Sequence, residues 1–195
     1  PDAMAERWTG RRVKPAEAEQ ISGIRDVRFL DAFEGELQKL LESGNYGTCY
    51  LDLFRTAPQD IARPAHYLAQ QLKARWPELE IPEACAILRC LRTIKSPEEI
   101  QALREAEKKT KAGILAMMQA SKPGMYEYQY KAEFDRALGQ FGPEGPGFPS
   151  IISAGANNFC IHYYGYTGQA QDGDMILNDV GAQHNNMITD VSRGW

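Results

Sequence analysis

The chain has 195 residues, 43% of them hydrophobic and 25% charged, a composition typical of a globular protein that is large enough to bury a core. A formal net charge of −4 argues against a general binder of nucleic acid or of anionic membranes, which needs a basic surface. No apolar run approaches the roughly 18 residues of a membrane span. The 4 cysteines form no C-x-x-C pair, so we expect reduced thiols in a cytoplasmic protein.

Helices and β segments alternate in the pattern of residues 1–91. Asp31 is the expected N-cap of one helix, because Glu34 follows it three residues later. The expected elements, in chain order, are a helix over 15–22, a strand over 27–30, the helix that begins at Asp31, a β segment over 47–54 and a helix over 64–76.

Two longer helices are predicted next. The first begins at Ser96, the N-cap of an S-x-x-E capping box with Pro97 in the first helical position, and ends before Pro123 and Gly124. The second carries a stripe of apolar side chains that we expect in the core and not on a binding platform. These are Tyr130, Phe134, Leu138 and Phe141.

From Gly142 onward the composition favours strands. A loop rich in Gly and Pro leads into a strand over 148–152, and a turn at 171–174 precedes two further apolar runs. Helices followed by paired strands predict an α+β fold and not a βαβ Rossmann pattern. No G-x-G-x-x-G or G-x-x-x-x-G-K motif supports nucleotide binding.

Asp179 and Asp190 each lie in one of the two final apolar runs. If these runs form a hairpin with a two-residue turn at His184 and Asn185, the two aspartates are directly opposed across the strands. A turn at Asn185 and Asn186 makes them diagonal neighbours on the same face. A three-residue loop sends them to opposite faces, because strand side chains alternate.

Two carboxylates on one half-buried face repel each other and resist desolvation. Such a pair needs a shared proton or a divalent cation. Oxygen ligands suit Mn²⁺, Mg²⁺ or Ca²⁺, and an added imidazole would also suit Zn²⁺, Co²⁺ or Fe²⁺. The alternative interpretation is that Asp179 caps a turn and Asp190 pairs with Arg193 at the surface.

Two stretches around these aspartates, FPSIISAGANNFCIHY and QDGDMILNDVGAQHNNMITDVSR, resemble the first half of the catalytic domain of Xaa-Pro aminopeptidases and prolidases. These enzymes are the creatinase-like, or pita-bread, metallopeptidases. Upstream, LRTIKSPEEIQALREA and KPGMYEYQYKAEF resemble the preceding helices of that domain, and ERWTGRR is similar to part of its small N-terminal domain. The resemblance implies that residues 1–91 are a remnant of the N-terminal creatinase-like domain, and that residues 92–195 are the first half of the pita-bread domain.

The resemblance also implies a site. Asp179 and Asp190 would be ligands of two divalent metal ions, manganese first and cobalt or zinc as alternatives, with Asp190 bridging both. His162 would lie by the metals and bind the substrate or stabilise the transition state. Without the resemblance, His162 is more simply a core or hydrogen-bonding residue, and His66 and His184 are expected to be structural or exposed.

The implied activity is metal-dependent hydrolysis of the bond between an N-terminal residue and a following proline, in a homodimer or larger assembly. A dipeptide-specific prolidase is the near alternative. The remaining ligands of the family, one histidine and two glutamates, would follow Trp195. We therefore expect an internal fragment that is inactive by itself. The competing hypothesis is a catalytically dead pita-bread module that binds protein or peptide.

Overall fold

The computed structural model describes residues 3–57 and 59–195. The chain divides into two compact units, Pro1–Leu91 and Arg92–Trp195, and each is described by itself. Within the described residues, no helix has the length and apolar character that a membrane crossing requires.

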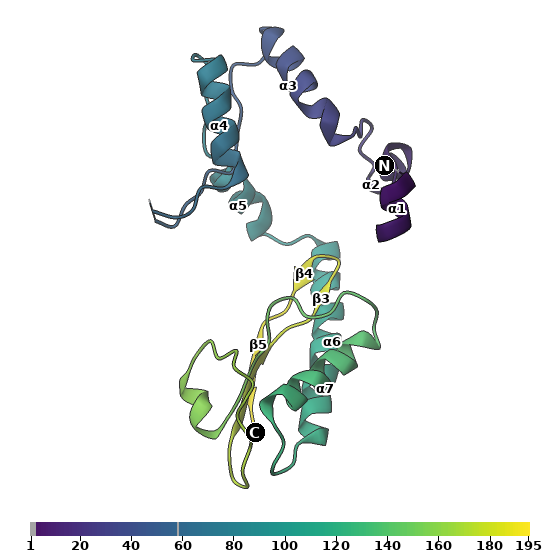
Figure 1. Ribbon diagram of the computed structural model, residues 1–195, viewed down its shortest axis with the longest axis vertical. Helices are drawn as coiled ribbons and strands as arrows, with labels where there is room; N and C mark the ends of the chain where they lie inside the picture. The colour runs from purple at the N-terminus through teal and green to yellow at the C-terminus, as the bar shows by residue number, and fades with distance from the viewer. Residues whose placement is uncertain (1–2, 58) are drawn as a thin grey trace. The chain divides into compact units, whose positions relative to one another are not determined.

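Helices are the main regular elements of the first unit (Figure 1). They are α1 (Ala3–Thr9), α2 (Pro15–Ser22), the 3-10 turn η1 (Leu30–Ala32), α3 (Phe33–Glu42), α4 (Pro64–Arg75) and α5 (Cys85–Thr93), whose last two residues belong to the second unit. The helices predicted over 15–22 and 64–76 are confirmed. In the predicted β segment over 47–54, the structure has isolated parallel bridges, and these join Thr48 to Glu80 and Leu51 to Glu83.

The strand predicted over 27–30 is wrong. Strand backbone needs a neighbouring segment for its N–H and C=O groups, and none of the described segments pairs with these residues. Asp31 consequently lies inside η1 and not at the N-cap. Helix α3 begins after Ala32, which provides no side-chain cap.

The second unit begins with the predicted capping box. The Ser96 hydroxyl accepts the Glu99 N–H at 3.2 Å, and the Glu99 carboxylate accepts the Ser96 N–H at 2.8 Å, which starts α6 (Pro97–Ala120). Helix α7 (Glu127–Gly139) follows and packs against α6. At their contact a Cβ added to Gly113 would lie 2.4 Å from Cδ2 of Phe134, so a side chain at this position would collide with the ring.

An antiparallel sheet lies beside these helices (Figure 1). Its strands are β1 (Ile151–Ala154), β2 (Ile176–Val180) and β5 (Val191–Gly194), in the order β1-β2-β5. A smaller hairpin of β3 (Gln183–His184) and β4 (Met187–Ile188) continues from β2 and returns to β5. The 3-10 turn η2 (Gly155–Phe159) opens the long connection between β1 and β2.

The core lies between α6, α7 and one face of the sheet. Alternate residues of β2, Ile176 and Val180 among them, are buried in it, so the other face of β2 carries Asp179. The predicted stripe on α7 is buried as far as Leu138, but Phe141 is 50% exposed because the helix ends at Gly139. The predicted α+β fold is confirmed, since the strand pairs in both described sheets are antiparallel.

Candidate metal centre

The hairpin turn lies at Asn185 and Asn186, the second of the two-residue turns considered above. His184 pairs with Met187, and both asparagines have left-handed backbones, with φ of 49° and 63°. Two consecutive left-handed residues define the type I′ turn, which matches the twist of a hairpin and which Asn tolerates well. The turn therefore sets a register in which Asp179 pairs with Ser192, and Asp190 is displaced by two residues along the same face.

The two carboxylates interact directly in this register. A hydrogen bond to Asp179, together with the negative charge of Asp179, raises the pKa of Asp190 above its ordinary value. On the other side, the Ser192 hydroxyl donates to Oδ1 of Asp179 at 2.9 Å. The guanidinium of Arg193, the expected alternative partner of Asp190, donates to the Ser192 carbonyl at 2.6 Å.

This arrangement fits a divalent cation. Two carboxylates in contact are stable only with a shared proton or a counter-charge, and hard carboxylate oxygens are ligands for Mn²⁺ and similar ions. Among the described residues, no group of three or more His, Cys, Asp or Glu side chains could hold a metal ion. Asp179 and Asp190 thus form a candidate pair without a third such side chain among the described residues, and His162 does not join them.

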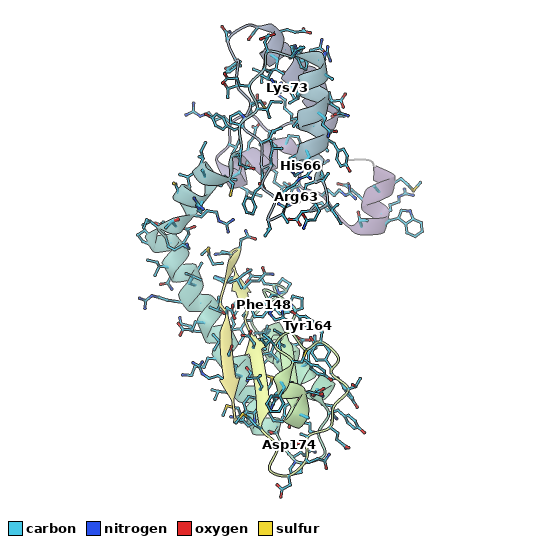
Figure 2. All side chains as sticks on the ribbon, turned by 90° about the vertical axis from the view of Figure 1, so that its left-hand side faces the viewer. Arg63, His66, Lys73, Phe148, Tyr164 and Asp174 are labelled. Carbon is cyan, nitrogen blue, oxygen red and sulfur yellow. The ribbon has the colours of Figure 1, made fainter. Side chains whose placement is uncertain are left out.

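Close packing keeps the backbone between the aspartates in place. A Cβ added to Gly181 would lie 1.7 Å from the Thr189 carbonyl oxygen and 2.9 Å from Cε1 of Phe148, so only glycine fits. Figure 2 shows Phe148 and Tyr164 toward one end of this unit and Asp174 toward the other. Gly181 is two residues from Asp179, so the position of this candidate ligand depends on the glycine.

A buried hydroxyl on α6 also supports the hairpin. Oγ1 of Thr110 accepts the Ala182 N–H at 2.8 Å and lies 2.7 Å from Oγ1 of Thr189. Thr110 is 1% exposed and Ala182 is fully buried. These contacts join the helix to both strands immediately beside Gly181 and Asp190.

The turn itself is held by charged groups. Lys109 Nζ and Glu144 Oε2 each lie 3.0 Å from Nδ1 of His184, and the Asn185 N–H donates to Glu144 Oε1 at 2.8 Å. Hydrogen bonds from Lys109 first, then from Asn185 and His184, lower the pKa of Glu144 to about 2. His184 therefore has a structural role, as expected, and so does His66, which accepts the Arg63 N–H at the start of α4.

Sequence reasoning missed Thr110, Lys109 and Glu144. Their partners are separated from them by 35 to 79 positions, and no local pattern marks such contacts. Glu127 was also missed, although a signal exists for it. It precedes Tyr130 by three residues and Phe134 by seven, so it shares the buried stripe of α7.

His162 lies on the connection between β1 and β2 and is exposed. Figure 1 shows this connection, in light green, projecting from the sheet. Nearby, Phe159 is 91% exposed and Ile161 is 83% exposed. The structure thus places the candidate catalytic histidine on a surface loop, apart from the two aspartates.

Comparison with known proteins gives consistent matches. The model of metallopeptidase family M24 matches residues 101–195. The Xaa-Pro aminopeptidase of Escherichia coli is 28% identical over 200 aligned residues, which cover 98% of this chain and 44% of that protein. Xaa-Pro aminopeptidase 3 of Mus musculus is 25% identical over 194 residues, covering 100% of this chain and 38% of that protein.

Solved structures agree with the sequence matches. A candidate aminopeptidase P from Bacillus anthracis superposes with a TM-score of 0.92 at 32% identity, covering 100% of this chain and 46% of that one. The chain spans less than half the length of these relatives. Residues 101–195 are thus similar to metallopeptidase family M24, and the chain forms part of an α+β pita-bread fold.

Proposed function

We propose that the complete protein is a metal-dependent exopeptidase that hydrolyses the bond between an N-terminal residue and a following proline. The observation that carries this proposal is the hairpin register, which makes Asp179 and Asp190 diagonal neighbours on one face within the segment that matches family M24. The similarity to Xaa-Pro aminopeptidases across nearly the whole chain supports the choice of substrate, a peptide with proline in its second position.

Asp179 and Asp190 are the proposed metal ligands, for two divalent ions with manganese as the first choice. When bound, such ions polarise a scissile carbonyl and lower the pKa of water. The chain itself contributes two carboxylates in a rigid hairpin whose mutual repulsion a cation relieves. The Ser192 hydroxyl donates a hydrogen bond to Oδ1 of Asp179, and this bond limits the rotation of the carboxylate.

His162 is the proposed residue for binding the substrate or stabilising the transition state. An imidazole that is exposed and free to face solvent can reach a substrate. The neighbouring Tyr164 lies toward the same end of the unit as Phe148, which packs at Gly181 between the aspartates (Figure 2).

Further parts of the proposal concern the whole protein. We assign residues 1–91 to a small N-terminal creatinase-like domain and residues 92–195 to the first half of the catalytic domain. A homodimer or larger assembly is also proposed. Its proposed compartment is the cytoplasm, because the four cysteines are free thiols.

Metal binding by this chain provides a direct test. We expect millimolar Mn²⁺ to raise the thermal unfolding temperature of the wild type, because a ligand that binds only the folded state stabilises it. Affinity should be weak, since two carboxylates leave most of the coordination sphere to water. Asp190→Asn should abolish the shift, whereas Asp172→Asn, an exposed turn residue, should retain it. Equal shifts in Asp190→Asn and the wild type would contradict the assignment.

Activity is tested with the complete gene product. With Mn²⁺ it should release the N-terminal residue from an Xaa-Pro peptide, and Asp179→Asn or Asp190→Asn should lower kcat/KM by more than roughly a hundredfold. Absence of turnover with Mn²⁺, Co²⁺ or Zn²⁺ would refute the proposed activity. Peptide binding without turnover, and with equal metal content in Asp190→Asn and the wild type, would instead indicate a catalytically dead binding module.

A further inference from the structure

Glu127 is a fully buried carboxylate at the first position of α7. A buried charge is costly unless hydrogen bonds replace its water. Here Oε1 accepts the Ala154 N–H and an N–H of the Asn157 side chain, both at 2.9 Å, and Oε2 accepts the Gly168 N–H at 2.7 Å. The position at a helix N-terminus also favours a negative charge.

These donors flank one segment of the chain, the 155–167 loop, which carries His162. Ala154 and Asn157 lie at its beginning, and Gly168 follows its end. The backbone adds a further contact, since the Glu127 N–H donates to the Gly168 carbonyl at 2.9 Å. A single carboxylate therefore holds both ends of the loop against α7.

The fit around this carboxylate is tight. A Cβ added to Gly168 would lie 2.5 Å from Nδ2 of Asn157 and 2.6 Å from Oε1 of Glu127, so a side chain at Gly168 would displace the carboxylate. The Asn157 amide also reaches the hydroxyl of Tyr163, at 3.1 Å. A continuous set of hydrogen bonds thus runs from Glu127 through Asn157 to the residue next to His162.

We propose that Glu127 is a positioning residue, which sets the location of His162 by holding the 155–167 loop. This inference rests on the role proposed above for His162. The loop exposes Phe159 and Ile161 to solvent, so few apolar contacts of these side chains can order it. Within the loop, Asn158 donates to the Met175 carbonyl and Tyr166 to the Ser150 carbonyl, whereas the Glu127 carboxylate joins the beginning of the loop to its end.

The negative charge of Glu127 is essential to this role. A carboxylate accepts hydrogen bonds through both oxygens, whereas the amide of Glu127→Gln has one oxygen and one NH₂ group. Either the Gly168 N–H or the Ala154 N–H would then face another donor. Loss of one hydrogen bond to a charged group predicts at least a roughly tenfold greater population of the open loop.

Amide hydrogen exchange of this chain tests the structural part. Glu127→Gln should speed the exchange of the Gly168 and Ala154 amides roughly tenfold or more, without a comparable change in α6. The matched control is Glu133→Gln on the same helix, which removes a partly exposed carboxylate that pairs with Arg136. Unchanged exchange at both loop ends in Glu127→Gln would overturn the proposal.

Kinetics of the complete, metal-loaded protein test the positioning role. Glu127→Gln should lower kcat/KM roughly tenfold or more while metal content stays at the wild-type level. In a His162→Ala background, the same change should have little further effect, because the two residues would act through one step. The inference would be overturned if the effects of Glu127→Gln and His162→Ala on kcat/KM multiplied, or if a loss of bound metal accounted for the loss of activity. Either result would leave the proposed function intact.

A second variant covers the case in which Glu127→Gln does not fold. Asn157→Ala leaves the buried charge in place and removes the link to Tyr163. It should lower kcat/KM in the wild type and have little effect in the His162→Ala background. An equal effect in both backgrounds would overturn the proposal. Complete inactivity of the wild-type protein would refute both the proposed function and this inference. An active wild type with the contrary results described above would refute this inference alone.

Discussion

Replacement of Thr110 by valine tests whether the buried hydroxyl holds the hairpin that carries the candidate ligands. Valine has nearly the shape of threonine, so it preserves the packing and removes the hydroxyl alone. The Ala182 N–H, now 2.8 Å from Oγ1, would lose its acceptor in a site with no solvent exposure. The Thr189 hydroxyl would lose its 2.7 Å contact as well.

The expected cost follows from these contacts. A buried N–H left without an acceptor costs about 1–3 kcal/mol, so we expect Thr110→Val to lower the free energy of unfolding by about 2 kcal/mol. Thr110→Ser is the matched control, because it keeps the hydroxyl and removes one buried methyl group. Its cost should be about 1 kcal/mol.

Urea unfolding followed by Trp195 fluorescence measures this effect in the second unit. Trp195 packs edge-on against Tyr130, with ring centroids 6.4 Å apart, so its emission reports on this core. Trp8 and Trp76 would be replaced by Phe in every variant to isolate the signal. Exchange of the Ala182 amide should accelerate in Thr110→Val and not in Thr110→Ser. A valine variant as stable as the wild type, or an unchanged Ala182 amide, would refute the reasoning.

Two further predictions concern packing and pH. Gly113→Ala should destabilise the second unit by about 1–3 kcal/mol in urea unfolding, because its Cβ would overlap the Phe134 ring, although alanine is the better helix former. The control is Gly139→Ala, which has open space around it and should cause no loss of stability. Equal stability of the two variants would contradict the clash. The pKa of Glu144, lowered to about 2 in the folded state chiefly by Lys109, implies stabilisation that is present above the ordinary value of 4.5 and is lost as the pH falls toward 2. As the pH falls across this range, the urea midpoint of unfolding should therefore decrease more steeply in the wild type than in Glu144→Gln. Parallel pH profiles of the two proteins would rule out this contribution.

Local signals predicted the second unit well. The capping box at Ser96 acts within one helical turn, and the apolar stripe of α7 repeats over a few residues, so both can be recognised without knowledge of the fold. The stripe was extended too far, to Phe141, because periodicity does not show where a helix ends. In the first unit the strand predicted over 27–30 failed for a related reason: a strand depends on a partner that its own residues do not specify.

The candidate site was predicted only as far as its local pattern extends. Sequence alone limited Asp179 and Asp190 to a few hairpin registers, and two of these placed both carboxylates on one face. The turn selects the register, because Asn185 and Asn186 adopt left-handed backbones there. Glu144, some 40 positions earlier in the chain, stabilises this turn by accepting the Asn185 N–H.

By itself, therefore, the sequence determined the helices of the second unit, the α+β order and the two aspartates as a candidate pair. Tertiary structure decided the register of the hairpin, the exposed position of His162 and the burial of Glu127 against both ends of its loop. The physical reason is the range of the interactions. Capping and periodicity act over a few residues, whereas the hydrogen bonds of Thr110 and Glu127 join segments that meet only when the chain has folded.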